Sequence, residues 1–458
     1  MLPMKKYILF FIVLNNFILF IKSNQIIFPF KTEDINIESS NYIESVIKNK
    51  IYITIEIGEP PQKINLYLTM DTCFLMIANS SLDSSYYNSG KSKTYVNTSK
   101  TSYYFEYFSN AYHATENFIF QTSYDSINTK VFKNIEFIHV LEYSASNYIL
   151  SGYFGLQLPK KNKMNIFDNF KKSNAISSHI FNLFYTSDNE GYLSIGELPF
   201  QFKDNQNEYS QKKVNALPCE NQNGINNDLC WYLKFNDIKF GDIKVNRERD
   251  ADISPDFGVI KGTQEYMEKI KINYFDKLFG NKCNLNLYEN SLYYYECDKD
   301  VNISSFKDLI FSHEEFMYNF VLTKDDLFIQ YRDKIYFLVV FDKFLSYGNN
   351  WILGKPFIKK YNFSYDADSK LILFYTNANE VKEAEKNKIK NKIIEIPNTF
   401  GYWIIIGILV LCVLVMALLV IIKVFYQPKK KLANELKEDI DYFNQENSGN
   451  YKENSLGI

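Results

Sequence analysis

Two aspartates occur in similar local sequences in the two halves of the chain. Asp71 lies two residues after Thr69, and Asp256 lies two residues after Ser254. If folding brings two carboxylates together, they can share one proton, so that the ionised partner acts as a general base and the protonated partner as a general acid. Serine and threonine hydroxyls cannot replace either partner, because they have no anionic form near neutral or acidic pH. The ordinary alternative for both aspartates is capping of backbone N–H groups in a turn.

The residues before Asp71 are predicted to form two strands joined by a tight turn. The turn has a G-x-P-x-Q pattern, made by Gly58, Pro60 and Gln62. Apolar residues alternate with other residues after it, as in a strand with one buried face; they are Ile64, Leu66 and Leu68. A strand, a turn and a second strand therefore lead into the first aspartate.

Several segments resemble landmarks of the pepsin-like aspartic proteases, and they follow the order of that family. They are IGEPPQKINLYLTMDTCFLMIANSS at 57–81, GYFGL at 152–156, GYLSIG at 191–196, ISPDFGVIKG at 253–262 and WILGKPFIKKY at 351–361. The resemblance covers roughly residues 42–376. It implies an all-β, two-lobed pepsin-like acid protease fold with a cleft between the lobes, a polypeptide substrate or ligand, and no metal or cofactor.

The family places an aspartate at the end of the second strand in each lobe, and two alignments compete for it. An ungapped alignment puts Thr69 and Ser254 at these positions, which implies that the catalytic pair is lost. A shift of two residues in each lobe makes Asp71 and Asp256 the pair, which implies an active endopeptidase. We favour the ungapped alignment, because the shift requires two matched changes of loop length. The flap is best matched at Tyr107, whose neighbours lack the glycines of the family flap.

Composition and apolar patterning favour a strand-rich protein. The 458 residues include 36 Tyr and 39 Phe, which favour strands, and short apolar runs separated by polar clusters predict an all-β chain. The lobes are expected at 42–200 and 201–390. A net charge of −2 with mixed signs gives no sign of nucleic-acid binding. The four histidines lack metal-ligand spacing; they are His113, His139, His179 and His313.

Two apolar runs predict the topology. Residues 1–23 have basic residues followed by an apolar run, as in a secretory signal. Residues 403–422 have no charge and are long enough for one transmembrane helix, with Lys423 and Lys429–Lys431 after it. The positive-inside rule then places the ectodomain in the lumen or outside the cell and the tail, 427–458, in the cytoplasm. We expect a single-pass type I membrane protein with a disordered tail.

The ectodomain carries features expected in an oxidising compartment. Short loops are bracketed by two cysteine pairs, Cys219 with Cys230 and Cys283 with Cys297; the second pair lies where pepsin-like enzymes have a second-lobe disulfide. Four N-glycosylation sequences are present, at Asn79, Asn97, Asn302 and Asn362.

Three functional hypotheses follow. The first is a non-catalytic protein that binds extended polypeptide in its cleft. The second is a membrane-anchored aspartic endopeptidase that uses Asp71 and Asp256. The third is a structural surface glycoprotein with a filled cleft.

Overall fold

The protein is represented by a computed structural model. It describes residues 25–35, 42–79, 86–98, 108–124, 128–143, 151–159, 165–199, 209–221, 224–245, 249–289, 291–342, 350–377, 414–415, 434 and 436–442. The chain divides into two compact units, Met1–Ala384 and Glu385–Ile458. The predicted signal and nearly all of the predicted transmembrane segment lie outside the described residues. Among the residues that are described, no helix is long and apolar enough to cross a membrane.

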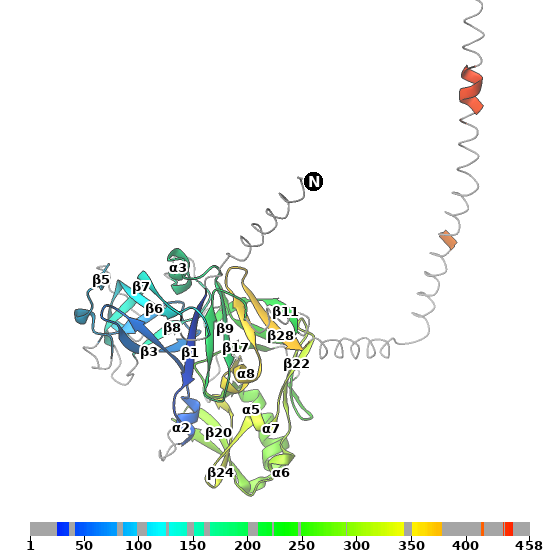
Figure 1. The fold of residues 1–458 in the computed structure, drawn as a ribbon. Coiled ribbons are helices and arrows are strands. Elements are labelled where there is room, and N and C mark those ends of the chain that lie inside the picture. Colours follow the sequence, from blue (N-terminus) through cyan, green and yellow to red (C-terminus); the bar gives the residue numbers. More distant parts are fainter. Residues whose placement is uncertain are drawn as a thin grey trace, which may run out of the picture. The chain divides into compact units, whose positions relative to one another are not determined.

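The first unit is built mainly from strands, which confirms the all-β prediction (Figure 1). Its largest sheet has 13 strands among the described residues. These strands are β1 (Ile26–Thr32), β2 (Ile51–Ile57), β3 (Gln62–Thr69), β4 (Leu75–Ala78), β5 (Val96–Asn97), β6 (Phe108–Gln121), β7 (Thr129–Tyr143), β8 (Gly152–Gly155), β9 (Ile180–Tyr185), β10 (Glu190–Ile195), β11 (Tyr209–Asn215), β27 (Phe363–Asp366) and β28 (Leu371–Asn377).

The second half of the chain forms three further sheets in the described part. The largest contains β14 (Tyr232–Phe235), β17 (Arg249–Ile253), β18 (Ile260–Gly262), β19 (Cys283–Tyr288), β20 (Leu292–Asp298), β23 (Phe328–Tyr331), β24 (Lys334–Phe337), β25 (Val339–Asp342) and β26 (Trp351–Leu353). The others contain β15 (Asp237–Phe240), β16 (Ile243–Val245), β21 (Leu309–His313) and β22 (Tyr318–Leu322), and β12 (Leu217–Asn221) with β13 (Gly224–Cys230).

Short helices cover the sheets. They are α2 (Tyr42–Ile47), α3 (Ile166–Lys172), α5 (Gln264–Ile270), α6 (Asp276–Leu278), α7 (Lys324–Leu327) and α8 (Lys355–Lys360), with a π-helical turn at Lys271–Phe275 between α5 and α6. Figure 1 shows β3, β5, β6 and β7 at one end of the first unit, and β20, β24, α6 and α7 at another. In the second unit, residues 436–442 are helical, whereas the sequence predicts a disordered tail.

The predicted strand–turn–strand unit is present as β2 and β3. Gly58 has a φ of +88°, a conformation that glycine adopts without strain. The Gln62 side chain donates to the carbonyl of Asn88 at 3.0 Å and accepts from its N–H at 2.9 Å. The turn glutamine therefore fixes the loop beside the hairpin.

The same crossing of strands occurs in both halves. In the first half, β8 runs parallel to β3 and antiparallel to β4, and β4 runs parallel to β7. In the second half, β26 runs parallel to β17 and antiparallel to β18, and β18 runs parallel to β25. In the first half, the loop between β3 and β4 therefore lies over the end of β8, the strand inserted between them. In the second half, the loop between β17 and β18 lies over the end of β26 in the same way.

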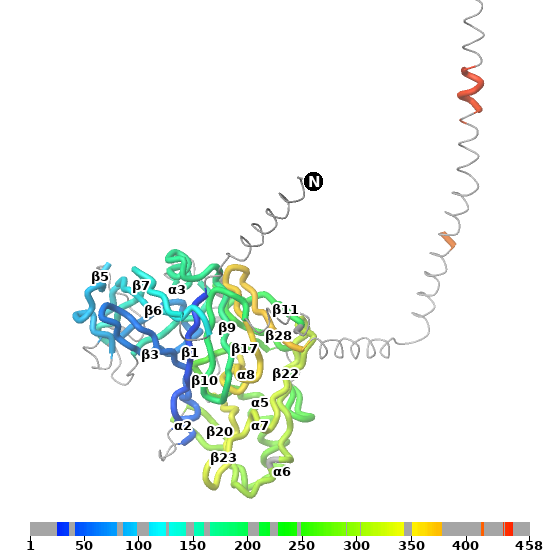
Figure 2. Tube along the Cα trace, viewed as in Figure 1, coloured from blue at the N-terminus to red at the C-terminus, as the bar shows by residue number. Residues whose placement is uncertain are grey.

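Strand β1, which precedes the expected start of the first lobe, and helix α2, which lies at that start, are both part of the fold. Strand β1 lies between β10 and β2 in the large sheet. Figure 2 labels β1 and its partner β10. Helix α2 packs against the second half, where Tyr42 stacks on Tyr331 with ring centroids 3.9 Å apart. The backbone N–H of Gly258 donates to the carbonyl of Ile47 at 3.1 Å. Strand β1 therefore belongs to the fold, and the segment from α2 to Lys50 contacts the second half.

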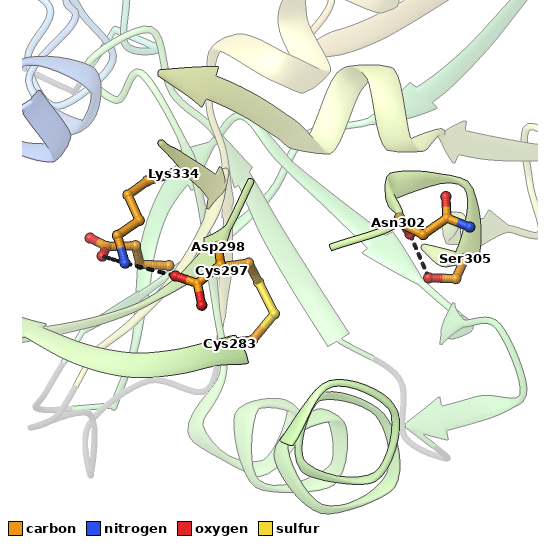
Figure 3. Close-up of a disulfide and its surroundings, with 7 residues drawn as sticks. Cys283, Cys297, Asp298, Asn302, Ser305 and Lys334 are labelled. Carbon is orange, nitrogen blue, oxygen red and sulfur yellow. Dashed lines mark hydrogen bonds and ion pairs between the residues drawn. A yellow bond between two sulfur atoms is a disulfide. The ribbon is translucent and has the colours of Figure 1, made fainter. Parts of the chain in front are cut away.

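Two disulfides link the cysteine pairs that the spacing predicts, Cys219 with Cys230 and Cys283 with Cys297. Cys283 and Cys297 face each other across β19 and β20. Beside this bond, Lys334 forms ion pairs with Asp298 at 3.0 Å and with Glu296 at 3.2 Å (Figure 3). The bond and the ion pairs hold β19, β20 and β24 together.

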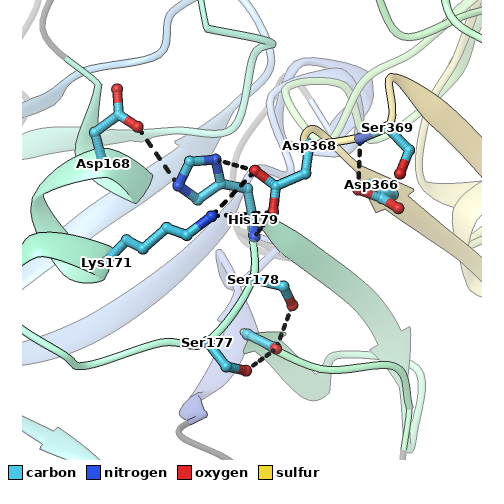
Figure 4. Close-up of polar contacts among 9 residues, drawn as sticks. Asp168, Lys171, Ser177, Ser178, His179, Asp366, Asp368 and Ser369 are labelled. Carbon is cyan, nitrogen blue, oxygen red and sulfur yellow. Dashed lines mark hydrogen bonds and ion pairs between the residues drawn. The ribbon is translucent and has the colours of Figure 1, made fainter.

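A polar cluster connects α3 with the turn between β27 and β28. The Asp368 carboxylate accepts from the backbone N–H of His179 and lies 3.0 Å from its ring Nδ1 (Figure 4). The Lys171 ammonium lies 3.3 Å from the same carboxylate, and Asp168 faces the other ring nitrogen at 3.5 Å. Burial opposes ionisation of Asp368, but the N–H donor and the neighbouring cations outweigh it and lower its pKa.

We predict that Asp368→Ala lowers the free energy of unfolding by about 1–2 kcal/mol, because it removes charge-assisted hydrogen bonds. Since the pKa of Asp368 is lowered in the folded state, the difference from the native chain is present above about pH 4 and shrinks as the pH falls through the lowered pKa. Urea unfolding measures both effects. The control is Asp188→Ala, which removes an ion pair with Lys359 whose aspartate is 83% exposed and should cost less than about 0.5 kcal/mol. Equal effects of the two substitutions would contradict the prediction.

Candidate functional site

Strands β3 and β17 bring Thr69 and Ser254 to equivalent places. Thr69 ends β3, opposite Gly155 of β8. Ser254 follows β17, and its N–H donates to the carbonyl of Leu353 at 3.2 Å, next to Gly354. A Cβ on either glycine would lie 2.4 Å or less from a backbone oxygen of the opposing loop. Neither glycine can carry a side chain here. The loop after Thr69 therefore packs directly on the backbone of Gly155, and the loop after Ser254 packs directly on that of Gly354.

The loops also agree position by position. A Cβ on Gly155 would meet Thr72 and Phe74, whereas one on Gly354 would meet Phe257 and Val259. Thr72 thus corresponds to Phe257, and Phe74 to Val259, each 185 positions later in the chain. The same separation of 185 positions relates Thr69 to Ser254 and Asp71 to Asp256. The two halves therefore match with no difference in loop length between them.

Hydroxyls from both halves meet on a single carboxylate. Thr69 Oγ1 and Ser254 Oγ each donate to Oδ2 of Asp256 at 3.0 Å. The backbone N–H of Met70 donates to the same oxygen at 3.4 Å. Thr69 and Ser254 are 3% and 2% exposed, so these contacts lie inside the protein. The two hydroxyl oxygens consequently lie within about 6 Å of each other.

The contacts of the two aspartates differ, although their positions correspond. The backbone N–H of Asp71 donates to Thr69 Oγ1 at 3.1 Å, and that of Asp256 donates to Ser254 Oγ at 3.3 Å. Only Asp256 also reaches across to the other half. Within the described residues, no hydrogen bond joins Asp71 to Ser254. Asp71 and Asp256 therefore occupy equivalent positions in the two halves, but their hydrogen bonds differ.

Three carboxyl groups in this region have raised pKa values. Burial raises the pKa of Asp256 to about 6, helped by the charge of Asp71 and opposed by the Lys50 ammonium and the two hydroxyl donors. Burial and the charges of Asp71 and Asp256 raise the pKa of Asp252 to about 8. Asp71 has an exposed surface, yet the surrounding protein removes enough water to raise its pKa also.

Comparison with known protein families matches residues 50–376 to the eukaryotic aspartyl protease family. The chain belongs to the eukaryotic aspartyl protease family. This match confirms the resemblance drawn from the sequence, and it spans the loops at Thr69 and Ser254. A search of curated proteins finds no match to the chain.

The remaining predicted site residues are the flap tyrosine and the four candidate glycosylation sites. Tyr107 of the predicted flap lies outside the described residues. Among the candidate glycosylation sites, Asn97 and Asn302 are exposed, whereas Asn79 and Asn362 are partly buried. Among the described residues, no group of three or more His, Cys, Asp or Glu side chains could hold a metal ion.

Sequence reasoning missed Asp252 and Lys50, although both act on this region. Asp252 lies two residues before Ser254 in an extended segment, and residues at this spacing share one face of a strand. That spacing could have identified Asp252 once Ser254 had been singled out. Lys50 precedes β2, and its place near Asp71 and Asp256 depends on the fold, so no local pattern predicts it.

We predict that Asp252→Asn stabilises the first unit, Met1–Ala384, at neutral and alkaline pH. Because the pKa of Asp252 is raised to about 8 on folding, the folded state binds more protons than the unfolded state between about pH 4 and pH 8, and the free energy of unfolding falls as the pH rises. The substitution should raise this free energy by about 1–3 kcal/mol at pH 8 and leave it nearly unchanged at pH 4. Urea unfolding at several pH values is the measurement, with the exposed Asp325→Asn as control. An unaltered pH dependence in Asp252→Asn would refute the assignment.

Proposed function

We propose that this protein is a non-catalytic member of the aspartyl protease family that binds extended polypeptide between its lobes. One observation carries the proposal: Thr69 and Ser254, at equivalent strand ends, both donate to the carboxylate of Asp256. The hydroxyls stand where the ungapped alignment places the family aspartates.

Hydrolysis of a peptide bond by this family needs two carboxylates that share a proton around a water molecule. Oδ2 of Asp256 already accepts hydrogen bonds from three donors: the hydroxyls of Thr69 and Ser254 and the N–H of Met70. These donors favour its ionised form but do not outweigh burial, which raises the pKa of Asp256 to about 6. Above about pH 6 Asp256 therefore has no proton to give, and below that pH it no longer acts as a base. The hydroxyls of Thr69 and Ser254 cannot act as the base, because they do not ionise near neutral or acidic pH. The arrangement supports contact between the lobes and gives no general acid–base pair.

Binding of polypeptide does not require the lost pair. Extended peptides can be held by backbone hydrogen bonds of the kind that join strands, while the side chains give specificity. The strand framework that surrounds the family site is retained in both halves, which supports binding as the retained activity. A structural surface glycoprotein would share the framework and bind no polypeptide.

We predict that the purified ectodomain, residues 24–395, binds reduced and alkylated protein without cleaving it between about pH 3 and pH 7, the range in which a carboxylate pair would share a proton. Binding is measured by fluorescence anisotropy and cleavage by gel and mass spectrometry. Thr69→Asp combined with Ser254→Asp should stay inactive and lose stability, because two more carboxylates would be placed beside Asp71 and Asp256. The control is Asp325→Asn on α7, which should behave as the unaltered ectodomain. Absence of any binding would leave the structural glycoprotein as the better interpretation.

The second candidate is an endopeptidase that uses Asp71 and Asp256. It is favoured by one observation: the charge of Asp71 raises the pKa of Asp256, as expected for carboxylates close enough to interact. Pepstatin-sensitive cleavage by the unaltered ectodomain, abolished by Asp71→Asn or Asp256→Asn, would establish this candidate and refute the non-catalytic one.

We further propose that the ectodomain is lumenal or extracellular and is anchored by residues 403–422 as a type I membrane protein. The uncharged length of this segment and the lysines after it support the proposal. We predict that protease added to sealed microsomes removes an epitope on the tail (427–458) and leaves the ectodomain intact. Detergent should then make the ectodomain accessible. Tail epitopes detected on intact, unpermeabilised cells would exclude this topology.

A further inference from the structure

A hollow of about 410 Å³ is lined by residues of β22 and β28. The end of α8 and Asn362, the residue before β27, complete its wall. Aromatic rings form much of its wall: Tyr318, Tyr361, Phe374 and Tyr375. The Tyr318 ring lies 4.9 Å from that of Phe374 and 6.2 Å from that of Tyr361, centroid to centroid. Polar groups, among them Lys360 and Thr323, stand at the same hollow. Apolar faces with a few polar groups are typical of sites that bind a small organic group.

Asn362, the first residue of a glycosylation sequence, also lines this hollow. Its backbone carbonyl accepts from the N–H of Tyr375 at 3.3 Å, whereas its side-chain amide makes no hydrogen bond to any described residue. The third residue of the sequence, Ser364, is 0% exposed and donates to Asn182. An enzyme could not reach this serine after folding, so a sugar on Asn362 would be added first and then lie against the open hollow as the chain folds.

We propose that Asn362 carries an N-linked glycan whose first N-acetylglucosamine lies in this hollow, against the rings of Tyr318 and Tyr361. In the attachment step, Asn362 Nδ2 forms a bond to the anomeric carbon of an oligosaccharide carried on a lipid diphosphate. The bond from that carbon to the diphosphate oxygen breaks, the lipid diphosphate leaves, and the amide loses one proton. The proposal rests on the lumenal location included in the proposed function and not on the loss of catalysis.

The other sequences offer matched comparisons. Asn302 is exposed, and its side-chain oxygen accepts from the N–H of Ser304 at 3.0 Å. Its backbone carbonyl accepts from the hydroxyl of Ser305 at 2.6 Å (Figure 3). Asn97 is exposed in β5. A glycan on either residue would extend into water, so enzymes that remove glycans should reach it in the folded protein.

The full-length chain, produced in a secretory host that adds N-glycans, is treated with peptide-N-glycosidase before and after denaturation. Mass spectrometry then follows the conversion of each asparagine to aspartate. We expect release from Asn362 to be at least about tenfold slower than from Asn302 in the folded protein, and equal after denaturation, because only folding brings the sugar against the hollow. Tyr318→Ala should accelerate release at Asn362 and leave release at Asn302 unchanged.

Two results would overturn the proposal. One is the absence of a glycan on Asn362 in the chain made by the secretory host, whether or not Asn97 and Asn302 are modified. The other is release from Asn362 at the rate of Asn302 in the folded protein. Neither result bears on peptide binding or cleavage, which are measured on the ectodomain without reference to its glycans.

Discussion

Three donors converge on Oδ2 of Asp256, and the junction of the two halves is organised around this contact. The Thr69 hydroxyl and the Met70 N–H come from the first half, and the Ser254 hydroxyl comes from the second. A buried carboxylate without such partners would be costly, whereas hydrogen bonds to the ionised form offset the loss of water. The strand crossing is what permits the contact, because close packing at Gly155 and Gly354 brings both loops to the same depth.

The N-terminal residues make a second connection between the halves. Lys355, at the start of α8, donates to Thr32 at 3.4 Å, Asn189 at 3.1 Å and Asn49 at 2.5 Å. All three acceptors are neutral, and burial lowers the pKa of Lys355 to about 8. Because Thr32 ends β1 and Asn49 follows α2, one ammonium group ties the closing helix of the second half to the segment that begins the fold.

The sequence predicts the parts of this fold that depend on local patterns. Gly58 and Gln62 mark the hairpin, and cysteine spacing gives both disulfides. Strand β1 was missed, because it directly follows the run predicted as a secretory signal and contains Pro29, a residue that argues against a strand inside a sheet. The meeting of Asp252, Asp256 and Lys50 depends on segments far apart in the chain, so single-sequence patterns do not contain it.

The asymmetric bonding of Asp71 and Asp256 makes the halves non-interchangeable. The donors that cross the junction, Thr69 and Met70, come from the first half, whereas the second half supplies the acceptor, Asp256, together with its own donor, Ser254. In two copies of the first half, Asp71 would stand in place of Asp256, and among the described residues the Asp71 side chain forms no hydrogen bond to Ser254. Two copies of the second would set one Asp256 against the other. Although the framework of each half repeats in the other, the hydrogen bonds at the junction make the two halves chemically unlike partners.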